Sequence, residues 1–355
     1  MHRWPLVVPI VAAALLGAAV ALPSNGVLAA LCGAALLAAV LAAVHHAEVI
    51  AHRLGEPLGT LVLALSVTVI EVALIVSMMV AGGPDKAPLA RDTVYSAVMI
   101  ICNGVVGICV LLGGLRHREQ KFRIESAGPT FAALVTLATL SLVLPSFTTT
   151  IPGPAYSRAQ LVFAGAASLV VWAIFTFAQT VRHREYFLPE GDGAPEEAHA
   201  APPSLREAWT SFGLLLVSLV AVVGLAKVLS PVIEAAVAAV GAPEAVIGIV
   251  IAMIVLLPET WAAIRAARAD RLQTSMNLAL GSALATIGLT IPAVVVVSIV
   301  LGLPLVLGLG AKDLVLMTLT FVVGGITLGP GRTSFLQGAV HLVIFAAFLF
   351  LAFVP

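Results

Sequence analysis

Charged residues are scarce in this sequence of 355 residues: Asp, Glu, Lys and Arg make up 10% of it, whereas hydrophobic residues make up 61%. A soluble domain of this size carries far more charge on its surface, so the composition excludes one and indicates a helical protein that crosses a membrane many times. The 18 basic and 18 acidic residues balance. The sequence therefore gives no indication of nucleic-acid binding, and the first partner we expect is the lipid bilayer.

Cysteine is also rare, with three residues in the chain. Cys32, Cys102 and Cys109 all fall within apolar runs, and the last two stand seven residues apart, too far along one helix to form a disulfide. Such positions are typical of small buried hydrophobic residues and not of a metal centre. We therefore expect no cofactor.

Apolar runs, in contrast, fill the chain. Because the backbone inside lipid must satisfy its own hydrogen bonds, we expect each run to be a helix. The first run resembles a secretory signal, but its length and the ten runs that follow predict an uncleaved span. The expected fold class is an all-α membrane protein with about 11 spans, at residues 5–22, 26–44, 57–81, 93–115, 127–145, 159–181, 208–229, 243–264, 274–301, 312–329 and 336–354.

The distribution of Lys and Arg predicts the orientation. If the spans alternate in direction, thirteen of the 18 residues fall on the side of the N-terminus and five on the other side. Connections on the cytoplasmic side of a membrane are enriched in these residues. We therefore expect a cytoplasmic N-terminus and a C-terminus outside.

One connection, residues 182–207, is rich in Pro, Gly and Glu, which is typical of a flexible cytoplasmic linker. It divides the chain into an extra N-terminal helix (1–25) and two sets of five spans (26–181 and 208–355). A weak cytosolic Ca²⁺ sensor remains an alternative to a solvated tether, because the linker contains Glu190, Asp192, Glu196 and Glu197.

Two glutamates lie alone inside apolar runs. Glu71 stands in "LSVTVIEVALIV", residues 65–76, and Glu259 stands in "GIVIAMIVLLPETWAAI", residues 248–264. A carboxylate at that depth is costly in lipid, so its presence indicates a function. The structural alternative is a protonated glutamate that only hydrogen-bonds a neighbour.

The span after each glutamate contains the pattern N-x3-G-x6-G. Glycine lets helices approach closely, so we expect these glycines to pack their spans against the spans that carry the glutamates. The pattern predicts an internal repeat, with copies at about 55–115 and 241–301. Its members are Asn103, Gly107 and Gly114 in the first copy, and Asn277, Gly281 and Gly288 in the second.

Each set has five spans, an odd number, so the second copy enters the membrane from the opposite side. Inverted repeats of this kind occur in many secondary transporters, where the binding site lies between the repeats near the bilayer midplane. Glu71 and Glu259 should therefore meet there, on antiparallel helices.

Neutral oxygens are available beside this pair. Pro258 cannot donate a backbone hydrogen bond, so it frees a carbonyl oxygen in the preceding turn. Carboxylates combined with neutral oxygens suit a hard cation such as Ca²⁺, and Na⁺ or K⁺ would also be accepted. Asn and Ser in membrane helices can alternatively serve only to hold helices together. The candidate neutral ligands are Asn103, Asn277 and Ser282, with Thr68 and Thr286 as secondary candidates.

The stretch "HHAEVIAHRLGE", residues 45–56, places His45, Glu48 and His52 on one face of a helix. The spacing matches no metalloprotease signature. We expect a polar helix at the membrane interface, with a proton-binding or regulatory role as the alternative.

At these residues the sequence resembles a known family. "GEPLGTLVLALSVTVIEVALIVSMM" and "LLPETWAAIRAARADRLQTSMNLALGSALATIGLTIP" resemble the two α-repeats of the calcium/cation antiporter superfamily and, within it, the bacterial ChaA-type calcium/proton exchangers. The resemblance covers residues 45–355. It implies two inverted five-helix halves in a bacterial inner membrane. It also implies that Glu71 and Glu259 bind the cation and the counter-ion protons, with Asn103, Asn277 and Ser282 at further polar positions.

The activity expected from this resemblance is exchange of Ca²⁺ for protons, with exchange of Na⁺ or K⁺ as the alternative. Two facing carboxylates away from water can hold protons, and a cation that stabilises both charges competes with those protons. If the protein changes sides only when the site is occupied, the competition becomes exchange. No nucleophile–base pair or metal triad is visible in the spans, so an enzyme is not expected, and a cation channel remains a further alternative.

Overall fold

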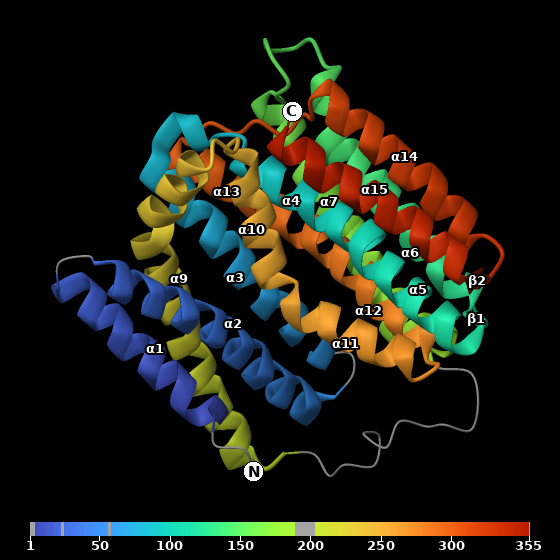
Figure 1. Ribbon diagram of the computed structural model, residues 1–355, viewed down its shortest axis with the longest axis horizontal. Helices are drawn as coiled ribbons and strands as arrows, with labels where there is room; N and C mark the ends of the chain where they lie inside the picture. Colours follow the sequence, from blue (N-terminus) through green and yellow to red (C-terminus); the bar gives the residue numbers. More distant parts are fainter. Residues whose placement is uncertain (1–3, 23–24, 56–57, 189–202, 355) are drawn as a thin grey trace.

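The computed structural model describes residues 4–22, 25–55, 58–188 and 203–354. Within these residues, 10 helices are long and apolar enough to cross a membrane, or 11 spans if one bent pair is counted as a span (Figure 1). The all-α fold with about 11 spans that the apolar runs predict is therefore confirmed. The three cysteines are buried and free, as expected.

An extra helix, α1 (Trp4–Ala21), precedes two sets of five spans. The first two spans of the first set are α2 (Gly26–Leu54) and α3 (Leu58–Gly82). The third span is continuous and consists of α4 (Leu89–Met99), η2 (Ile100–Val105) and α5 (Val106–His117). The fourth is α6 (Ile124–Ala138) with η3 (Thr139–Val143) and η4 (Leu144–Ser146), and the fifth is α7 (Arg158–Phe177) with η5 (Ala178–Arg182). The second set consists of α9 (Leu205–Ala239), the bent pair α10 (Ala245–Val255) and α11 (Leu257–Arg268), the continuous α12 (Leu272–Ala285), η7 (Thr286–Thr290) and α13 (Ile291–Leu301), α14 (Ala311–Leu328) and α15 (Phe335–Phe353).

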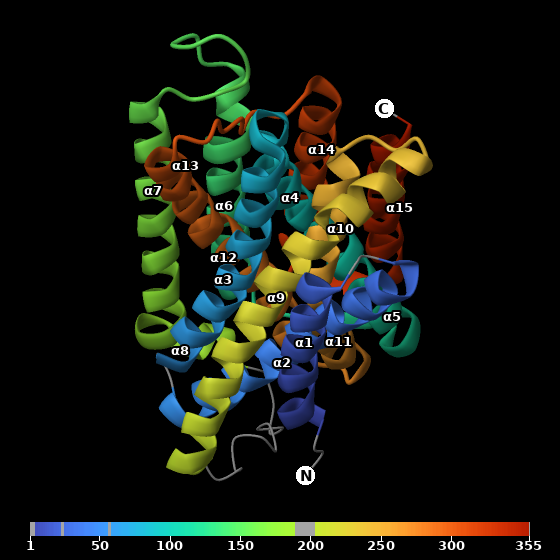
Figure 2. The ribbon, with the colours of Figure 1, turned by 90° about the vertical axis from the view of Figure 1, so that its left-hand side faces the viewer.

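The two sets run in opposite directions. The first helices of the sets, α2 and α9, pack against each other, with α1 against both (Figure 2). The end of α2 lies beside the start of α9, where Arg53 Nη1 donates a hydrogen bond to the Pro203 carbonyl at 3.2 Å. Equivalent spans therefore cross the bundle in opposite senses, and the two ends of the chain lie at opposite ends of the bundle (Figure 2).

One end of the bundle, here called the basic end, gathers most of the Lys and Arg of the described residues. It contains the connections α2–α3, α5–α6, α11–α12 and α14–α15, the end of α7 and the start of α9. The opposite end is called the far end. The cytoplasmic N-terminus that the sequence predicts would place the basic end in the cytoplasm. The basic residues at this end are Arg53, Arg116, Arg118, Lys121, Arg123, Arg182, Arg184, Arg206, Arg265, Arg268, Arg271 and Arg332.

A short antiparallel sheet joins the two sets at the basic end. β1 (Glu119–Lys121) follows α5 and β2 (Arg332–Ser334) follows α14, with Gln120 opposite Thr333. At the far end, the Leu309 amide donates to the Leu142 carbonyl at 2.9 Å. The halves are thus tied together at both ends.

The predicted linker is shorter in the structure. Arg184–Phe187 form a small helix, α8, and α9 already begins at Leu205. Ser204 caps α9 by accepting from the Glu207 amide, and the Glu207 carboxylate accepts from the Ser204 amide in return. This capping box starts the helix inside the predicted linker. The acidic positions at 190–197 lie outside the described residues.

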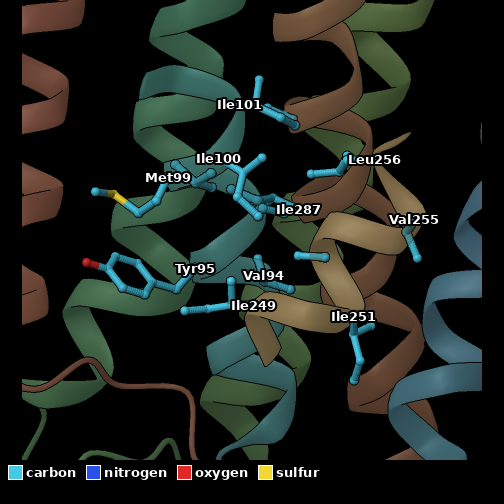
Figure 3. Close-up of a cluster of buried hydrophobic side chains, with 14 of the residues drawn as sticks. Val94, Tyr95, Met99, Ile100, Ile101, Ile249, Ile251, Val255, Leu256 and Ile287 are labelled. Carbon is cyan, nitrogen blue, oxygen red and sulfur yellow. The ribbon is translucent and has the colours of Figure 1, made fainter. Parts of the chain in front are cut away.

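A cluster of buried apolar side chains lies where the two sets cross. It joins α4 and η2 of the first set to α10 and η7 of the second. Figure 3 shows Ile100, Leu256 and Ile287 in this cluster, while Tyr95 and Met99 point to the other side of α4. The core of the bundle is therefore built from both repeats.

Candidate functional site

Glu71 lies midway along α3 and is buried, with 2% of its surface exposed. Thr290 Oγ1 donates a hydrogen bond of 2.8 Å to Glu71 Oε2, and the Thr286 hydroxyl is a second hydrogen-bond partner of this carboxylate. Both threonines belong to η7, a π-helical turn in the second set. The carboxylate of one repeat is therefore held by hydroxyl groups of the other.

Glu259 lies directly after a break in its span. The axes of α10 and α11 differ by 57°, and Pro258 stands at the start of α11. Proline has no N–H, and its ring clashes with the carbonyl four residues earlier, here that of Ile254. The structure thus breaks the span beside Pro258, where the sequence predicts only a freed carbonyl oxygen. It puts Glu259 into the first turn of α11, where free N–H groups and the helix dipole favour a negative charge.

The two carboxylates interact electrostatically. Glu71 and Glu259 lie within range of direct electrostatic repulsion, and Glu48 on α2 is within such range of Glu259. Among the described residues, Glu259 Oε2 is buried and has no hydrogen-bond partner. A buried carboxylate oxygen without a partner is costly unless it holds a proton or a cation.

The depths of the two glutamates match. Glu71 stands thirteen residues after the start of α3 at Leu58, and Glu259 stands fourteen residues after the start of α10 at Ala245. Because these spans run in opposite directions, the repeat brings one carboxylate to the centre from each end.

The atoms around the pair suit a hard cation. Within the described residues, no three His, Cys, Asp or Glu side chains come together as a metal cluster. The donors at the pair are carboxylate oxygens and the hydroxyl oxygens of Thr286 and Thr290, which Ca²⁺ and alkali ions prefer over the nitrogen and sulfur ligands of transition metals. These donors make the pair a candidate site for such a cation.

Two further predicted oxygens lie one turn from these groups. Thr68, one turn before Glu71, is buried and donates to the Ala64 carbonyl at 2.8 Å, so its hydroxyl proton is used within α3 while its oxygen can still accept. Ser282 lies one turn before Thr286 and is half-buried. Each therefore stands one helical turn along the chain from a residue of the candidate site.

Asn103 does not face the carboxylates. Its Nδ2 donates to Thr320 Oγ1 at 2.9 Å, and its Oδ1 lies 3.2 Å from His341 Nδ1. Thr320 and His341 belong to α14 and α15. Both ends of the Asn103 amide are therefore occupied by the last two helices, in contrast to the predicted role as a cation ligand.

Asn277 also lies away from the pair. Its Nδ2 donates to the Phe187 carbonyl at 2.7 Å, and its Oδ1 accepts from Gln273 Nε2 at 2.9 Å. Phe187 is the last residue of α8, at the basic end. Asn277 thus holds the short helix that precedes the linker and does not reach the predicted site.

Side chains from both repeats cap α8. A helix of four residues has no internal partners for its last carbonyls. The Arg123 guanidinium donates to the Glu185 carbonyl. Together with the bond from Asn277 to the Phe187 carbonyl, this contact satisfies two carbonyls of the short helix.

The predicted pairing of Asn103 with Asn277 is wrong. Asn103 stands fourteen residues after its span begins at Leu89, whereas Asn277 stands only five residues after its span begins at Leu272. The residue of the second set at the depth of Asn103 is Thr286, fourteen residues after Leu272. The shared N-x3-G-x6-G pattern therefore marks different depths in the two repeats.

Two glycines of the pattern pack closely, but against α15. A Cβ at Gly107 would lie 3.1 Å from the Cβ of His341, and a Cβ at Gly114 would lie 2.4 Å from the backbone nitrogen of Phe335. The expected partner was the span that carries a glutamate. These glycines instead dock the last helix of the second set.

The other two glycines differ from each other. A Cβ at Gly288 would lie 2.6 Å from the Cβ of Trp172 on α7, so this position requires glycine. A Cβ at Gly281 would meet no atom within 4 Å. The predicted packing role of Gly281 is therefore wrong, because its face of α12 has open space beside it.

The histidine-rich stretch lies at the basic end of α2. The His45 ring lies beside that of Trp4, tilted by 45° with centroids 5.8 Å apart, and Glu48 and His52 are exposed. Among the three residues on this face of α2, Glu48 interacts electrostatically with Glu259. The predicted proton-binding or regulatory role therefore remains a proposal for Glu48.

A neighbouring histidine, His46, is the buried one. Its Nε2 lies 2.9 Å from the Pro5 carbonyl and its Nδ1 lies 3.2 Å from Ser211 Oγ. It therefore joins α1, α2 and α9 at one point.

Sequence reasoning missed Thr290, Thr320 and His341. Thr290 stands four residues after Thr286 and could have been found as the next residue on the same helical face. His341 is an ionisable residue inside an apolar span, which is itself an indication of function. Thr320 carried no such indication, because a threonine that bonds its own helix is common in membranes.

Comparison with known proteins gives consistent matches. The profile of the family described as "Sodium/calcium exchanger protein" matches residues 25–181 and 210–354, two blocks that coincide with the two sets of spans. The chain is 48% identical over 356 residues to the putative ionic transporter y4hA of Sinorhizobium fredii, covering 99% of this chain and 96% of that protein. It is 36% identical over 321 residues to the sodium-potassium/proton antiporter ChaA of Escherichia coli, covering 90% and 86%. The structure of native YfkE superposes with a TM-score of 0.74 at 18% identity, covering 99% of this chain and 100% of that chain, and supports the fold.

Proposed function

The chain belongs to the sodium/calcium exchanger family, and from that premise we propose that it exchanges Ca²⁺ for protons at the Glu71–Glu259 pair. Membership makes it a transmembrane cation antiporter and not an enzyme. We also propose which ions are exchanged, which residues bind them and how the protein is oriented in the membrane.

The unpartnered oxygen of Glu259 carries the proposal. Glu71 has hydroxyl donors from Thr286 and Thr290, whereas Glu259 Oε2 is buried without a partner. Two buried carboxylates that repel each other are stabilised either by protons or by a cation between them. Occupation by one excludes the other, and this competition is the chemical basis of exchange.

Divalent charge favours Ca²⁺ over the alkali ions at this pair. Two ionised carboxylates are balanced by one Ca²⁺, with Thr286, Thr290 and Ser282 available as neutral oxygens. The second candidate is exchange of Na⁺ or K⁺ for protons. It is supported by the 36% identity to a protein named sodium-potassium/proton antiporter.

Glu48 extends the acidic groups toward the basic end. It lies six residues before the end of α2 at Leu54, and it interacts electrostatically with Glu259. We place the basic end in the cytoplasm and the protein in the bacterial inner membrane. In this arrangement Glu48 passes protons or attracts cations between Glu259 and the cytoplasm.

Everted membrane vesicles test the proposal. The vesicles are acidified inside, lumenal pH is followed with a quenched dye, and Ca²⁺, Na⁺, K⁺ or Mg²⁺ is added in turn. We expect a pH rise with Ca²⁺ that Glu71→Gln and Glu259→Gln both abolish. The matched control is Glu125→Gln, which removes an exposed carboxylate of α6.

Each outcome has a clear meaning. A response to Na⁺ or K⁺ alone would replace Ca²⁺ by the second candidate. Unchanged exchange in either glutamine variant, at equal protein levels, would overturn the assignment of the site.

A further inference from the structure

His341 is a candidate for a further functional residue. It is buried in α15, with 1% of its surface exposed. Both nitrogens of its ring have partners: Nδ1 lies 3.2 Å from Asn103 Oδ1, and Nε2 lies 3.0 Å from Thr327 Oγ1. Asn103 in turn donates to Thr320 Oγ1 at 2.9 Å. Four buried polar side chains from three spans therefore form one network.

The direction of each hydrogen bond follows from the backbone. Thr320 Oγ1 donates to the Leu316 carbonyl at 2.8 Å, so it accepts from the Asn103 amide nitrogen. Asn103 Oδ1 then faces His341 and must accept, which places the imidazole proton on Nδ1. Nε2 accepts from the Thr327 hydroxyl. A neutral histidine thus satisfies every contact, and a network that is fully satisfied holds its members in one arrangement.

The network is attached to a π-helical turn. Asn103 belongs to η2, where one extra residue widens the helix between α4 and α5. Such turns are rare and are frequent at functional sites. The contacts of Asn103 with α14 and α15 fix the position of this turn from one side.

The opposite side of the same turn supports the break beside Glu259. η2 packs against α11, the helix that carries Glu259, and Figure 3 shows Ile100 of η2 and Leu256 in the same cluster of buried side chains. Leu256 is the residue at which α10 ends and α11 begins, three residues before Glu259. A continuous chain of contacts therefore leads from His341 through Asn103 and η2 to the turn that carries Glu259.

We propose that His341 is a positioning residue for Glu259: it holds Asn103 and η2 in the place against which the α10–α11 break rests. Glu71 depends on a different support, because Thr290 and Thr286 hold its carboxylate from η7. Loss of the His341 network should therefore disturb cation binding through Glu259 and not through Glu71. This inference rests on the proposed function of the glutamate pair.

The rival explanation is that the network only holds α15 in the folded bundle. Such a role would lower the amount of folded protein and leave the properties of the folded fraction unchanged. A coupling measurement separates the two explanations, because residues that act through one another have non-additive effects, whereas independent residues have additive ones.

The experiment measures the half-saturating Ca²⁺ concentration in vesicles for His341→Leu, Glu259→Asp, Glu71→Asp and the two double variants that contain His341→Leu. We expect His341→Leu to raise this concentration by about tenfold, the size of one lost buried polar contact. Combined with Glu259→Asp its effect should shrink to less than about threefold, and combined with Glu71→Asp it should persist in full.

A second pair of variants protects the test against misfolding. Thr320→Val keeps the shape of the side chain and removes the acceptor for Asn103, so it should give the same pattern as His341→Leu. Thr130→Val is the matched control, because the Thr130 hydroxyl donates only to the Ser126 carbonyl of its own helix at 2.7 Å. It should leave the half-saturating concentration unchanged.

The inference would be overturned if the effect of His341→Leu were additive with the effects of both glutamate variants. It would also be overturned if His341→Leu and Thr320→Val were folded and had wild-type affinity. Either result would leave the proposed function intact. Wild-type affinity in both Glu71→Asp and Glu259→Asp would overturn the proposed function, and the inference with it.

Discussion

Thr290 of the second repeat donates a hydrogen bond of 2.8 Å to Glu71 of the first repeat. The bond crosses from η7 to α3, between two spans that run side by side but come from different halves of the chain. A hydroxyl donor stabilises the ionised form of a carboxylate. If a cation binds at Glu71 as we propose, the opposite repeat stabilises the charge that binds it.

We expect Thr290→Val to weaken cation binding. The variant keeps the volume of the side chain and removes the donor, and a hydrogen bond to a charged group contributes about 1.5–3 kcal/mol, so the half-saturating Ca²⁺ concentration should rise by about tenfold or more. Thr290→Ser retains the hydroxyl and should remain close to wild type. Thr318→Val, which removes an exposed hydroxyl of α14, serves as the control. Equal affinities in Thr290→Val and Thr290→Ser would contradict the role of this bond.

Much of the fold could be predicted because hydrophobicity in membrane spans is a local property. Each run of apolar residues reports its own helix, and the eleven runs correspond to the spans observed. Glu71 and Glu259 could be found for the same reason, since a charge inside such a run is conspicuous. Pro258 predicted a freed carbonyl oxygen from its own covalent structure.

The neutral ligands could not be predicted in this way. Whether Asn103 and Asn277 reach the glutamates depends on where each span begins and on the extra residue in η2, which no spacing rule contains. Thr320 and His341, the partners of Asn103 on α14 and α15, stand more than 200 positions away along the chain. The pairing of β1 with β2 could not be predicted either, because strands of three residues carry too weak a local pattern.

Two glycines of the repeated pattern should respond differently to alanine. At Gly288 a Cβ would lie 2.6 Å from the Cβ of Trp172, and such overpacking costs about 1–3 kcal/mol, so Gly288→Ala should lower the thermal midpoint in detergent. At Gly281 the space is open, and an alanine in a helix is favoured over glycine by about 0.5–1 kcal/mol. Gly281→Ala should therefore be neutral or slightly stabilising. A loss of stability in both variants would show that α12 is packed more tightly than the structure has it.

Asn277→Ala should release α8 and leave the cation affinity nearly unchanged. The variant removes the donor to the Phe187 carbonyl, so trypsin should cleave after Arg184 several times faster, as expected for a local bond worth about 1 kcal/mol. Gln273→Ala should also accelerate cleavage, because it removes the donor to Asn277 Oδ1 and so loosens the amide that holds the Phe187 carbonyl. The half-saturating Ca²⁺ concentration should stay within about twofold of wild type in both. A large loss of affinity with unchanged cleavage would restore Asn277 as a ligand.

Pro258→Ala should make the protein more stable and a poorer transporter. Alanine restores the backbone donor that the Ile254 carbonyl lacks and removes the ring that clashes with this carbonyl, so α10 and α11 can join into a straighter helix with one more backbone hydrogen bond. Glu259 would then leave the first turn of α11 and lose the free N–H groups that favour its charge. The measurements are the thermal midpoint, which should rise, and the half-saturating Ca²⁺ concentration, which should rise by about tenfold, the effect of one lost hydrogen bond to a charged group.

Pro231→Ala supplies the matched control. Pro231 lies inside α9, which continues unbroken from Leu205 to Ala239. Replacing Pro231 should change the stability of the protein and not its transport. Neither Glu71 nor Glu259 depends on α9 for a position in the first turn of a helix. If Pro258→Ala and Pro231→Ala both transported like wild type, the break would be incidental, and the position of Glu259 would have to be set by its neighbours on α5 and η2 instead.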